Sequence, residues 1–124
     1  MSWEVVWEPR GVLRRFVGRV DGEQLLRSVA EVHGDWRFDT LRYSINDFLA
    51  VESLELDQQA LEQAAAETIG ASQSNGRLVV LIVARDPHVV DIARRFTSPP
   101  LANYPAHFFD SIEEARAWVA DHLG

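Results

Sequence analysis

The continuously apolar stretch Leu78-Val79-Val80-Leu81-Ile82-Val83-Ala84 decides the fold. Successive side chains of a strand point to opposite faces, so an unbroken apolar run is typical of a central parallel strand that is covered on both faces. Asp86 and Pro87 follow, and they predict a helix with an N-cap aspartate and a first-turn proline. One face of that helix carries Val89, Ile92, Ala93 and Phe96. This segment is therefore predicted to form a strand and helix in the middle of a sheet.

The N-terminal part of the chain predicts a pair of strands. Residues 3–8 alternate in the manner of a half-buried strand, and residues 12–20 have the pattern of a second one. Between them stands the turn sequence Pro9-Arg10-Gly11. So short a connection predicts an antiparallel hairpin.

Two helices and a third strand are predicted between the hairpin and the central unit. The first helix begins at Asp21, where Gln24 stands at the right spacing for a capping box, and it ends at Gly34. The third strand covers residues 41–47. The next helix runs from Asp57 to about residue 72 and is rich in alanine at its centre, so it could approach the sheet closely or leave room beside it.

The C-terminal part adds one strand and one helix. Residues 97–100 contain two prolines and end the preceding helix, residues 106–109 form a short strand, and Ser111 with Glu114 caps a final helix. The stripe predicted to be buried on that helix is Ala115, Trp118, Val119 and His122. The order β-β-α-β-α-β-α-β-α predicts an α/β fold: one domain over residues 1–124, with a mostly parallel five-stranded sheet and four helices.

Composition excludes several classes of protein. The chain has 124 residues, 47% of them hydrophobic and 25% charged, which is ordinary for one globular domain. It contains no cysteine, which excludes disulfides, thiolate metal sites and cysteine nucleophiles. The net charge of −7 disfavours binding to nucleic acid or to anionic lipid. No stretch has the length of a membrane span and no signal peptide precedes the first strand, so a cytoplasmic location is expected.

Four segments carry a resemblance to a known family. The most suggestive are residues 18–22, 43–47, 83–87 and 109–119. With the order of elements, they are similar to the SpoIIAA-like fold of STAS domains and anti-sigma-factor antagonists, and to a branch of small stand-alone bacterial proteins with no assigned activity. The resemblance covers essentially the whole chain. It implies a regulatory or protein-interaction role.

The chain departs from that family at the start of the second helix. Regulatory STAS proteins carry Asp-Ser-Ser/Thr-Gly there, with a serine that a partner kinase phosphorylates. This chain reads Asp57-Gln58-Gln59-Ala60, and glutamine accepts no phosphoryl group. Ser53 lies a few residues upstream, where a serine is commonplace. The sequence therefore predicts a domain without the phosphoserine switch.

Carboxylates at strand ends raise the possibility of an enzyme. Asp47 and Asp86 are expected near the carboxyl ends of strands, where open α/β sheets bind ligands, and they could hold a cation or transfer protons. The alternative is that Asp21, Asp57 and Asp86 are helix N-caps, which leaves Asp47 the least explained. The four histidines lack the spacing of metal ligands. No metal or cofactor site is predicted.

Two groups of side chains are candidate interfaces. Arg15 and Arg19 share one face of the second strand, and Arg42 shares a face of the third with Ser44 and Asn46. If these faces coincide, one side of the sheet is polar and lined with arginine; a solvated face with cross-strand ion pairs is the alternative. Trp3 and Trp7 lie on one face of the first strand, as interface anchors or as a cover over the end of the core.

The connection before the second helix is unusually apolar. Residues 48–56 are treated as a loop, and they could line a ligand pocket, touch a membrane or belong to the core. With neighbouring polar groups they form a candidate ligand or partner surface: Asp47, Phe48, Leu49, Val51, Leu54, Asp57, Gln58, Gln59 and Asp86. Three functions stay open: a protein-interaction module that could be a homodimer, a carrier of a small apolar or lipid-like ligand, and an enzyme that uses Asp47 and Asp86.

Overall fold

The computed structural model describes residues 3–98 and 104–123. Its five strands are β1 (Trp3–Trp7), β2 (Gly11–Asp21), β3 (Tyr43–Glu55), β4 (Val79–Val83) and β5 (Ala106–Phe109). Its four α-helices are α1 (Gly22–His33), α2 (Gln58–Ser74), α3 (Pro87–Phe96) and α4 (Ile112–Leu123). A short 3-10 helix, η1 (Trp36–Thr40), which the sequence did not predict, lies between α1 and β3. The predicted order of strands and α-helices is confirmed.

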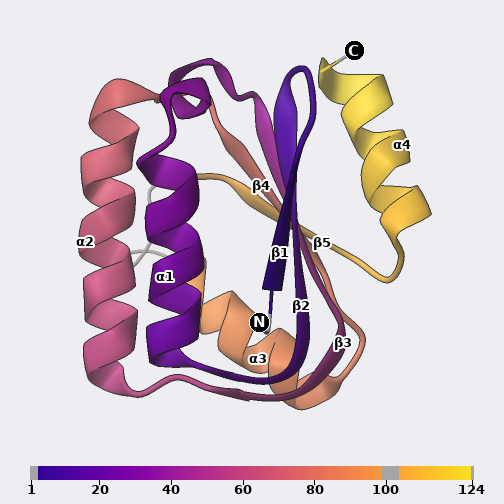
Figure 1. The fold of residues 1–124 in the computed structure, drawn as a ribbon. Coiled ribbons are helices and arrows are strands. Elements are labelled where there is room, and N and C mark those ends of the chain that lie inside the picture. Colours follow the sequence, from indigo (N-terminus) through magenta and orange to yellow (C-terminus); the bar gives the residue numbers. More distant parts are fainter. Residues whose placement is uncertain (1–2, 99–103, 124) are drawn as a thin grey trace.

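The strands form one sheet in the order β1-β2-β3-β4-β5. β1 and β2 are the predicted antiparallel hairpin, and each later pair of neighbours is parallel. Right-handed crossovers between neighbouring strands that follow chain order carry every connecting helix to the same side. Accordingly α1, α2 and α3 lie on one face of the sheet, and α4 lies on the other (Figure 1). Below they are called the three-helix face and the α4 face.

The third strand is longer than predicted. β3 continues beyond Asp47 to Glu55, so the prediction of a loop over residues 48–56 is wrong. β4 pairs with β3 only as far as Asp47. Beyond that point residues 50–55 pair with residues 17–21 of β2 alone. The two strands thus extend from the sheet as a ribbon that leads into α1 and α2 (Figure 1).

Irregular register accompanies this ribbon. The pairing of β2 with β3 shifts between Arg15 and Val17 and again between Gly18 and Arg19. Gly18 has a φ of +75°, a left-handed conformation that glycine adopts without steric cost. These shifts break the alternation of apolar and polar residues, which explains why the end of β3 resembled a loop in the sequence.

The core is divided between the two faces. On the three-helix face Phe16, Phe48 and Ile82 pack against α1 and α3, and the rings of Phe16 and Phe48 stack with centroids 4.9 Å apart. On the α4 face Ile45 and Leu81 pack against Ala115. The central strand is buried on both sides, as predicted from its continuous apolar run.

Aspartate caps fix the starts of the first three helices. Asp21 and Gln24 form the predicted capping box, and the side chains of Asp57 and Asp86 accept hydrogen bonds from backbone N–H groups of α2 and α3. The predicted stripe of α4 is only partly correct, because Ala115 is buried whereas His122 is exposed and stacks on Trp118.

The start of α1 lies very close to the alanine-rich helix α2. A Cβ atom added at Gly22 would lie only 2.5 Å from the Cβ of Ala60. Only glycine fits at this contact, which explains the small residues on both helices. At its start, α2 thus packs closely against α1.

Candidate functional site

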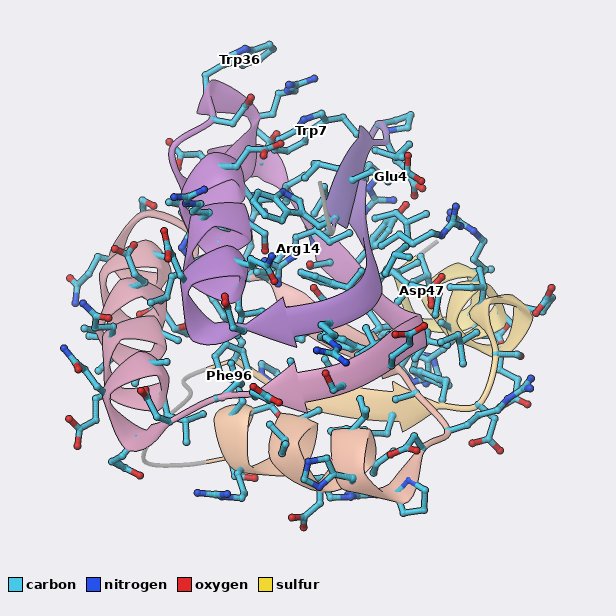
Figure 2. The ribbon with its side chains drawn as sticks, turned by 60° about the horizontal axis from the view of Figure 1, so that its bottom comes forward. Glu4, Trp7, Arg14, Trp36, Asp47 and Phe96 are labelled. Atoms are coloured by element: carbon cyan, nitrogen blue, oxygen red, sulfur yellow. The ribbon has the colours of Figure 1, made fainter. Side chains whose placement is uncertain are left out.

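A buried arginine on the three-helix face is the most unusual polar feature of the fold. Arg14 of β2 lies opposite Asn46 of β3, and its Nε donates a 2.8 Å hydrogen bond to Asn46 Oδ1. Its Nη1 donates to Ser28 Oγ of α1 at 3.0 Å. Figure 2 shows Arg14 between the strands and α1. Three elements therefore hold this guanidinium in place.

The residues around Arg14 form a connected polar group within the apolar core. Asn46 is 1% exposed, and its Nδ2 donates to the carbonyls of Ser44 and Leu81. Ser28 is fully buried and donates to the carbonyl of Leu25. Each of these side chains already has partners of its own, which fixes the orientation of the groups that accept from Arg14.

The guanidinium of Arg14 has no counter-ion among the residues that the structure describes. No carboxylate lies within ion-pair distance of it, and the charge of the exposed Glu31 of α1, which raises its pKa through space, is a smaller effect than burial. Burial is the main effect and lowers the pKa of Arg14 to about 10. From a starting value of 12.5, this corresponds to a cost on the order of 3 kcal/mol for holding the charge inside the fold.

One nitrogen of Arg14 is available for a further contact. Nε and Nη1 are engaged, whereas Nη2 makes no hydrogen bond with any residue in the described ranges. Arg14 retains some accessible surface. Arg14 also lines a cavity, so part of this surface is available to a molecule bound there.

That cavity has a volume of about 60 Å³ and lies between the sheet and the helices of the three-helix face. Its walls are mostly apolar, and they come from β2, β3 and β4 on one side and from α1, α2 and α3 on the other. Phe48 and Leu54, two of the residues singled out in the sequence, are among them. The arrangement is an apolar chamber with a cationic group in its wall.

His33 adds a second polar group to the same cavity. Its side chain lines the cavity from the end of α1, and its ring packs against Phe38 with centroids 4.7 Å apart. Its Nδ1 is buried without a hydrogen-bond partner in the described part of the chain. Burial first, and then the charge of Arg14, lowers the pKa of His33 to about 4. The imidazole is therefore neutral at physiological pH.

The neighbouring pair of residues on the same two strands faces the other way. Arg15 lies opposite Asp47, and its Nε lies 3.2 Å from Asp47 Oδ2 while its Nη1 lies 3.2 Å from Glu4. Asp47 also accepts from the backbone N–H of Leu49. Figure 2 shows Asp47 on the side of α4, away from Arg14. The predicted coincidence of Arg15 with Ser44 and Asn46 on one face is therefore wrong, since Arg14 takes that position.

The remaining candidates of the predicted ligand surface are divided between different places. Leu49 is 41% exposed, Val51 packs partly against the core of the three-helix face, and Gln58 is exposed on α2. Asp57 and Gln59 line an open hollow between the starts of the first three helices, together with Asp21, His88 and Asp91. Asp86 does not line this hollow. The structure thus does not bring Asp47 and Asp86 together with the start of α2.

No metal centre is assembled in the hollow or elsewhere in the described ranges. Residues 3–98 and 104–123 contain no group of three histidine, aspartate or glutamate side chains placed to bind an ion. The carboxylate of Asp86 accepts from the backbone N–H groups of His88 and Val89. Ser53, the other candidate near this end of the fold, lies within β3 and not in a loop.

The candidate interface residues of the sequence lie at several positions. Trp3 and Trp7 of β1 are half-buried against the core of the three-helix face, and the guanidinium of Arg37 stacks over Trp7 at 4.0 Å. Arg19 is exposed, and Arg42 precedes β3 with its Nε buried and without a described partner. Trp36, which sequence reasoning did not single out, is 83% exposed and projects from the end of the fold (Figure 2).

Sequence reasoning also missed Arg14, although a signal was present. Val12, Arg14 and Phe16 occupy alternate positions of β2, and both apolar neighbours are fully buried. A charged residue in the core-facing phase of a strand is rare without a special role. The alternation therefore placed Arg14 inward, but a long basic side chain was easily interpreted as surface.

Comparison with known proteins establishes the fold. The anti-sigma factor antagonist SpoIIAA in its unphosphorylated form has a TM-score of 0.62 and 12% sequence identity, covering 97% of this chain and 98% of that one. The Bacillus cell fate determinant SpoIIAA in the phosphorylated form has a TM-score of 0.55 and 15% identity, covering 94% and 98%. An uncharacterized protein of the DUF3478 family from Shewanella loihica PV-4 has a TM-score of 0.50 and 13% identity, covering 94% and 90%.

These similarities confirm the SpoIIAA-like fold that the sequence predicted. The chain matches no protein-family model and no curated protein. No helix among the described residues combines the length and the apolar character needed to cross a bilayer.

Proposed function

We propose that this SpoIIAA-like domain binds a small, mainly apolar ligand in the cavity of the three-helix face. The observation that carries the proposal is the cavity itself, about 60 Å³ of space lined by three strands and three helices. Cores of folded proteins are normally packed without voids of this size. A buried water needs roughly 10–15 Å³ of such space, so the cavity has room for about four to six non-hydrogen atoms.

The start of α2 supports a signal other than phosphorylation. SpoIIAA has been described in phosphorylated and unphosphorylated forms. In this chain Asp57 is the helix N-cap, and Gln58-Gln59-Ala60 offers no hydroxyl group. Ala60 is moreover packed against Gly22. In this proposal a small ligand inside the fold replaces the phosphoryl group as the controlling signal of a regulatory domain, or is the cargo of a carrier.

Two measurements test ligand binding. Native mass spectrometry of gently purified protein should show an added small mass. ¹²⁹Xe NMR should show a saturable shift, because xenon enters apolar cavities. If the mass spectra show no adduct and the NMR spectra show no saturable xenon shift, the proposal is wrong.

A matched pair of variants locates the ligand. Thr68 of α2 lines the cavity, so Thr68→Leu should fill part of it, weaken xenon binding and stabilise the protein by about 1 kcal/mol. Thr40 is exposed and makes the same kind of hydrogen bond to a preceding carbonyl, so Thr40→Leu is the control. Equal xenon binding by both variants would place the ligand elsewhere.

A protein interface is the second candidate function, favoured by one part of the α4 face. Val6 pairs with Leu13, a residue of the core of that face, and Val6, Val17 and Leu49 are all more than 40% exposed. Apolar side chains that share an exposed sheet face are typical of contact surfaces. The partner could be a different protein or a second copy. The same native mass spectra report the number of subunits, and Val17→Glu should abolish any dimer that uses this surface.

A further inference from the structure

The polar groups of the cavity indicate what kind of ligand it binds. Arg14 contributes a partly buried positive charge without a described counter-ion, and its Nη2 makes no hydrogen bond to a described residue. His33 contributes Nδ1, which is buried and also without a partner among these residues. Buried polar groups in native proteins almost always have partners, so the unpartnered Nδ1 of His33 points to a ligand in the cavity, and the unbonded Nη2 of Arg14 in the same wall offers that ligand a donor.

We propose that the cavity binds a short-chain monocarboxylate whose carboxylate contacts Arg14 and whose alkyl chain lies against the apolar walls. This inference rests on the proposed ligand-binding function and deepens it by naming the class of ligand. A carboxylate oxygen accepts a charge-assisted hydrogen bond from Arg14 Nη2. The neutral ring of His33 donates to the same group when its proton is on Nδ1.

Size and charge favour a monocarboxylate over a phosphorylated compound. The volume accommodates about four to six non-hydrogen atoms, which is the range from acetate to butyrate. Among the described residues of the wall Arg14 is the only arginine, and the chain contains no lysine. One guanidinium balances one negative charge, whereas a phosphate monoester carries close to two at neutral pH.

Asn46 is the residue that leaves Arg14 able to bind an anion. It holds Nε in place with a neutral carbonyl oxygen and does not cancel the charge. The adjacent pair shows the alternative, because Asp47 neutralises Arg15. An aspartate at position 46 would neutralise Arg14 in the same way, so Asn46→Asp should compete with the ligand from inside the protein.

The test compares butyrate with its neutral isostere butyramide, by isothermal titration calorimetry and by amide chemical shifts. Wild type should bind butyrate at least about tenfold more tightly than butyramide. Arg14→Met and Asn46→Asp should each weaken butyrate binding by at least about tenfold, one by removing the cation and the other by neutralising it. Arg15→Met is the control and should leave the affinity unchanged.

The outcomes separate this inference from the proposed function. If butyrate and butyramide bind equally and Arg14→Met has no effect, the carboxylate inference is wrong while ligand binding stands. If xenon and both compounds fail to bind, both proposals are wrong. Arg14→Gln, which keeps hydrogen-bonding groups near Asn46 and Ser28, replaces Arg14→Met if that variant does not fold. Retained butyrate affinity in Arg14→Gln would equally overturn the inference.

Discussion

Two adjacent pairs of residues on the same two strands hold an arginine in opposite environments. Arg14 and Asn46 face the three helices, and Arg15 and Asp47 face α4. Arg15 contacts two carboxylates, whereas Arg14, which is also partly exposed, contacts an amide and a hydroxyl. In both pairs the cation is an arginine of β2, and its partner lies opposite it on β3.

The difference lies in how each charge is balanced. Water and the carboxylates of Glu4 and Asp47 balance the charge of Arg15. The ion pair of Arg15 with Asp47 therefore contributes little to stability, and Arg15 requires no bound anion. Arg14 is only partly accessible and has no counter-ion among the described residues. A buried cation of this kind lowers stability in the free protein and attracts an anion. Under the proposed function, a ligand bound on the three-helix face would therefore raise the stability of the protein.

The largest expected effect comes from removing the acceptor of the buried arginine. Asn46→Leu leaves Nε of Arg14 and the carbonyl of Leu81 without their partner, and should lower the free energy of unfolding by about 3 kcal/mol. Asp47→Asn on the other face keeps an acceptor for the N–H of Leu49, and should cost less than about 1 kcal/mol. Urea unfolding measures both, and equal losses would remove the distinction between the faces.

The free energy of unfolding should depend on pH differently for groups on the two faces, and this effect should be somewhat smaller than that of Asn46→Leu. His33 has a pKa of about 4 in the fold and about 6.5 in the unfolded chain, so the unfolded chain binds more protons between these values. Stability should therefore fall as the pH decreases from 6.5 to 4. The loss should be about 2 kcal/mol, because partial exposure of the ring screens the effect.

Glu8 on the α4 face should respond in a lower pH range than His33. The hydrogen bond from Arg116 is the main cause that lowers its pKa below 4.5, so its contribution is present above that pH and is lost only as the pH falls further. His33→Phe keeps a ring against Phe38 and should flatten the response between pH 4 and 6.5 while leaving the acid limb. An unchanged response in this variant would show that folding does not lower the pKa of His33.

The smallest effects should differ in sign. Arg14→Met removes an uncompensated charge and should raise the free energy of unfolding by about 1 kcal/mol in the absence of ligand. Arg15→Met leaves the carboxylate of Asp47, which is 7% exposed, with the backbone N–H of Leu49 as its described donor. It should lower stability by about 1 kcal/mol. Thermal unfolding checks both, and a loss of stability in Arg14→Met would contradict the account of the buried charge.

Local sequence patterns were sufficient to predict most of the fold. Because strands and helices alternate along the chain, the apolar run of β4 predicts a buried parallel strand. The caps at Asp21, Asp57 and Asp86 depend only on residues within one turn of each helix. The end of β3 was missed because its pairing with β2 shifts register near Gly18, and a shift of register is a property of two strands together.

The candidate site could be predicted only in part, for a related reason. Phe48 and Leu54 were singled out from the sequence and do line the cavity, because apolar residues beside a helix start were expected to meet the core. The hydrogen bond from Arg14 to Ser28 joins β2 to α1, and the residue pattern of β2 alone does not predict which helix packs against it. The cavity depends on how six elements pack, and no single segment records its volume.

The ribbon formed by the ends of β2 and β3 has a consequence for timing. Each of its strands has one hydrogen-bonded neighbour, so it can open locally while the five-stranded part of the sheet stays paired. Leu54 belongs to this ribbon and also to the cavity wall. We therefore expect a bound molecule to leave when the ribbon opens, so that more frequent opening shortens its residence time. Amide hydrogen exchange at residues 50–55 should then report the rate of ligand exchange.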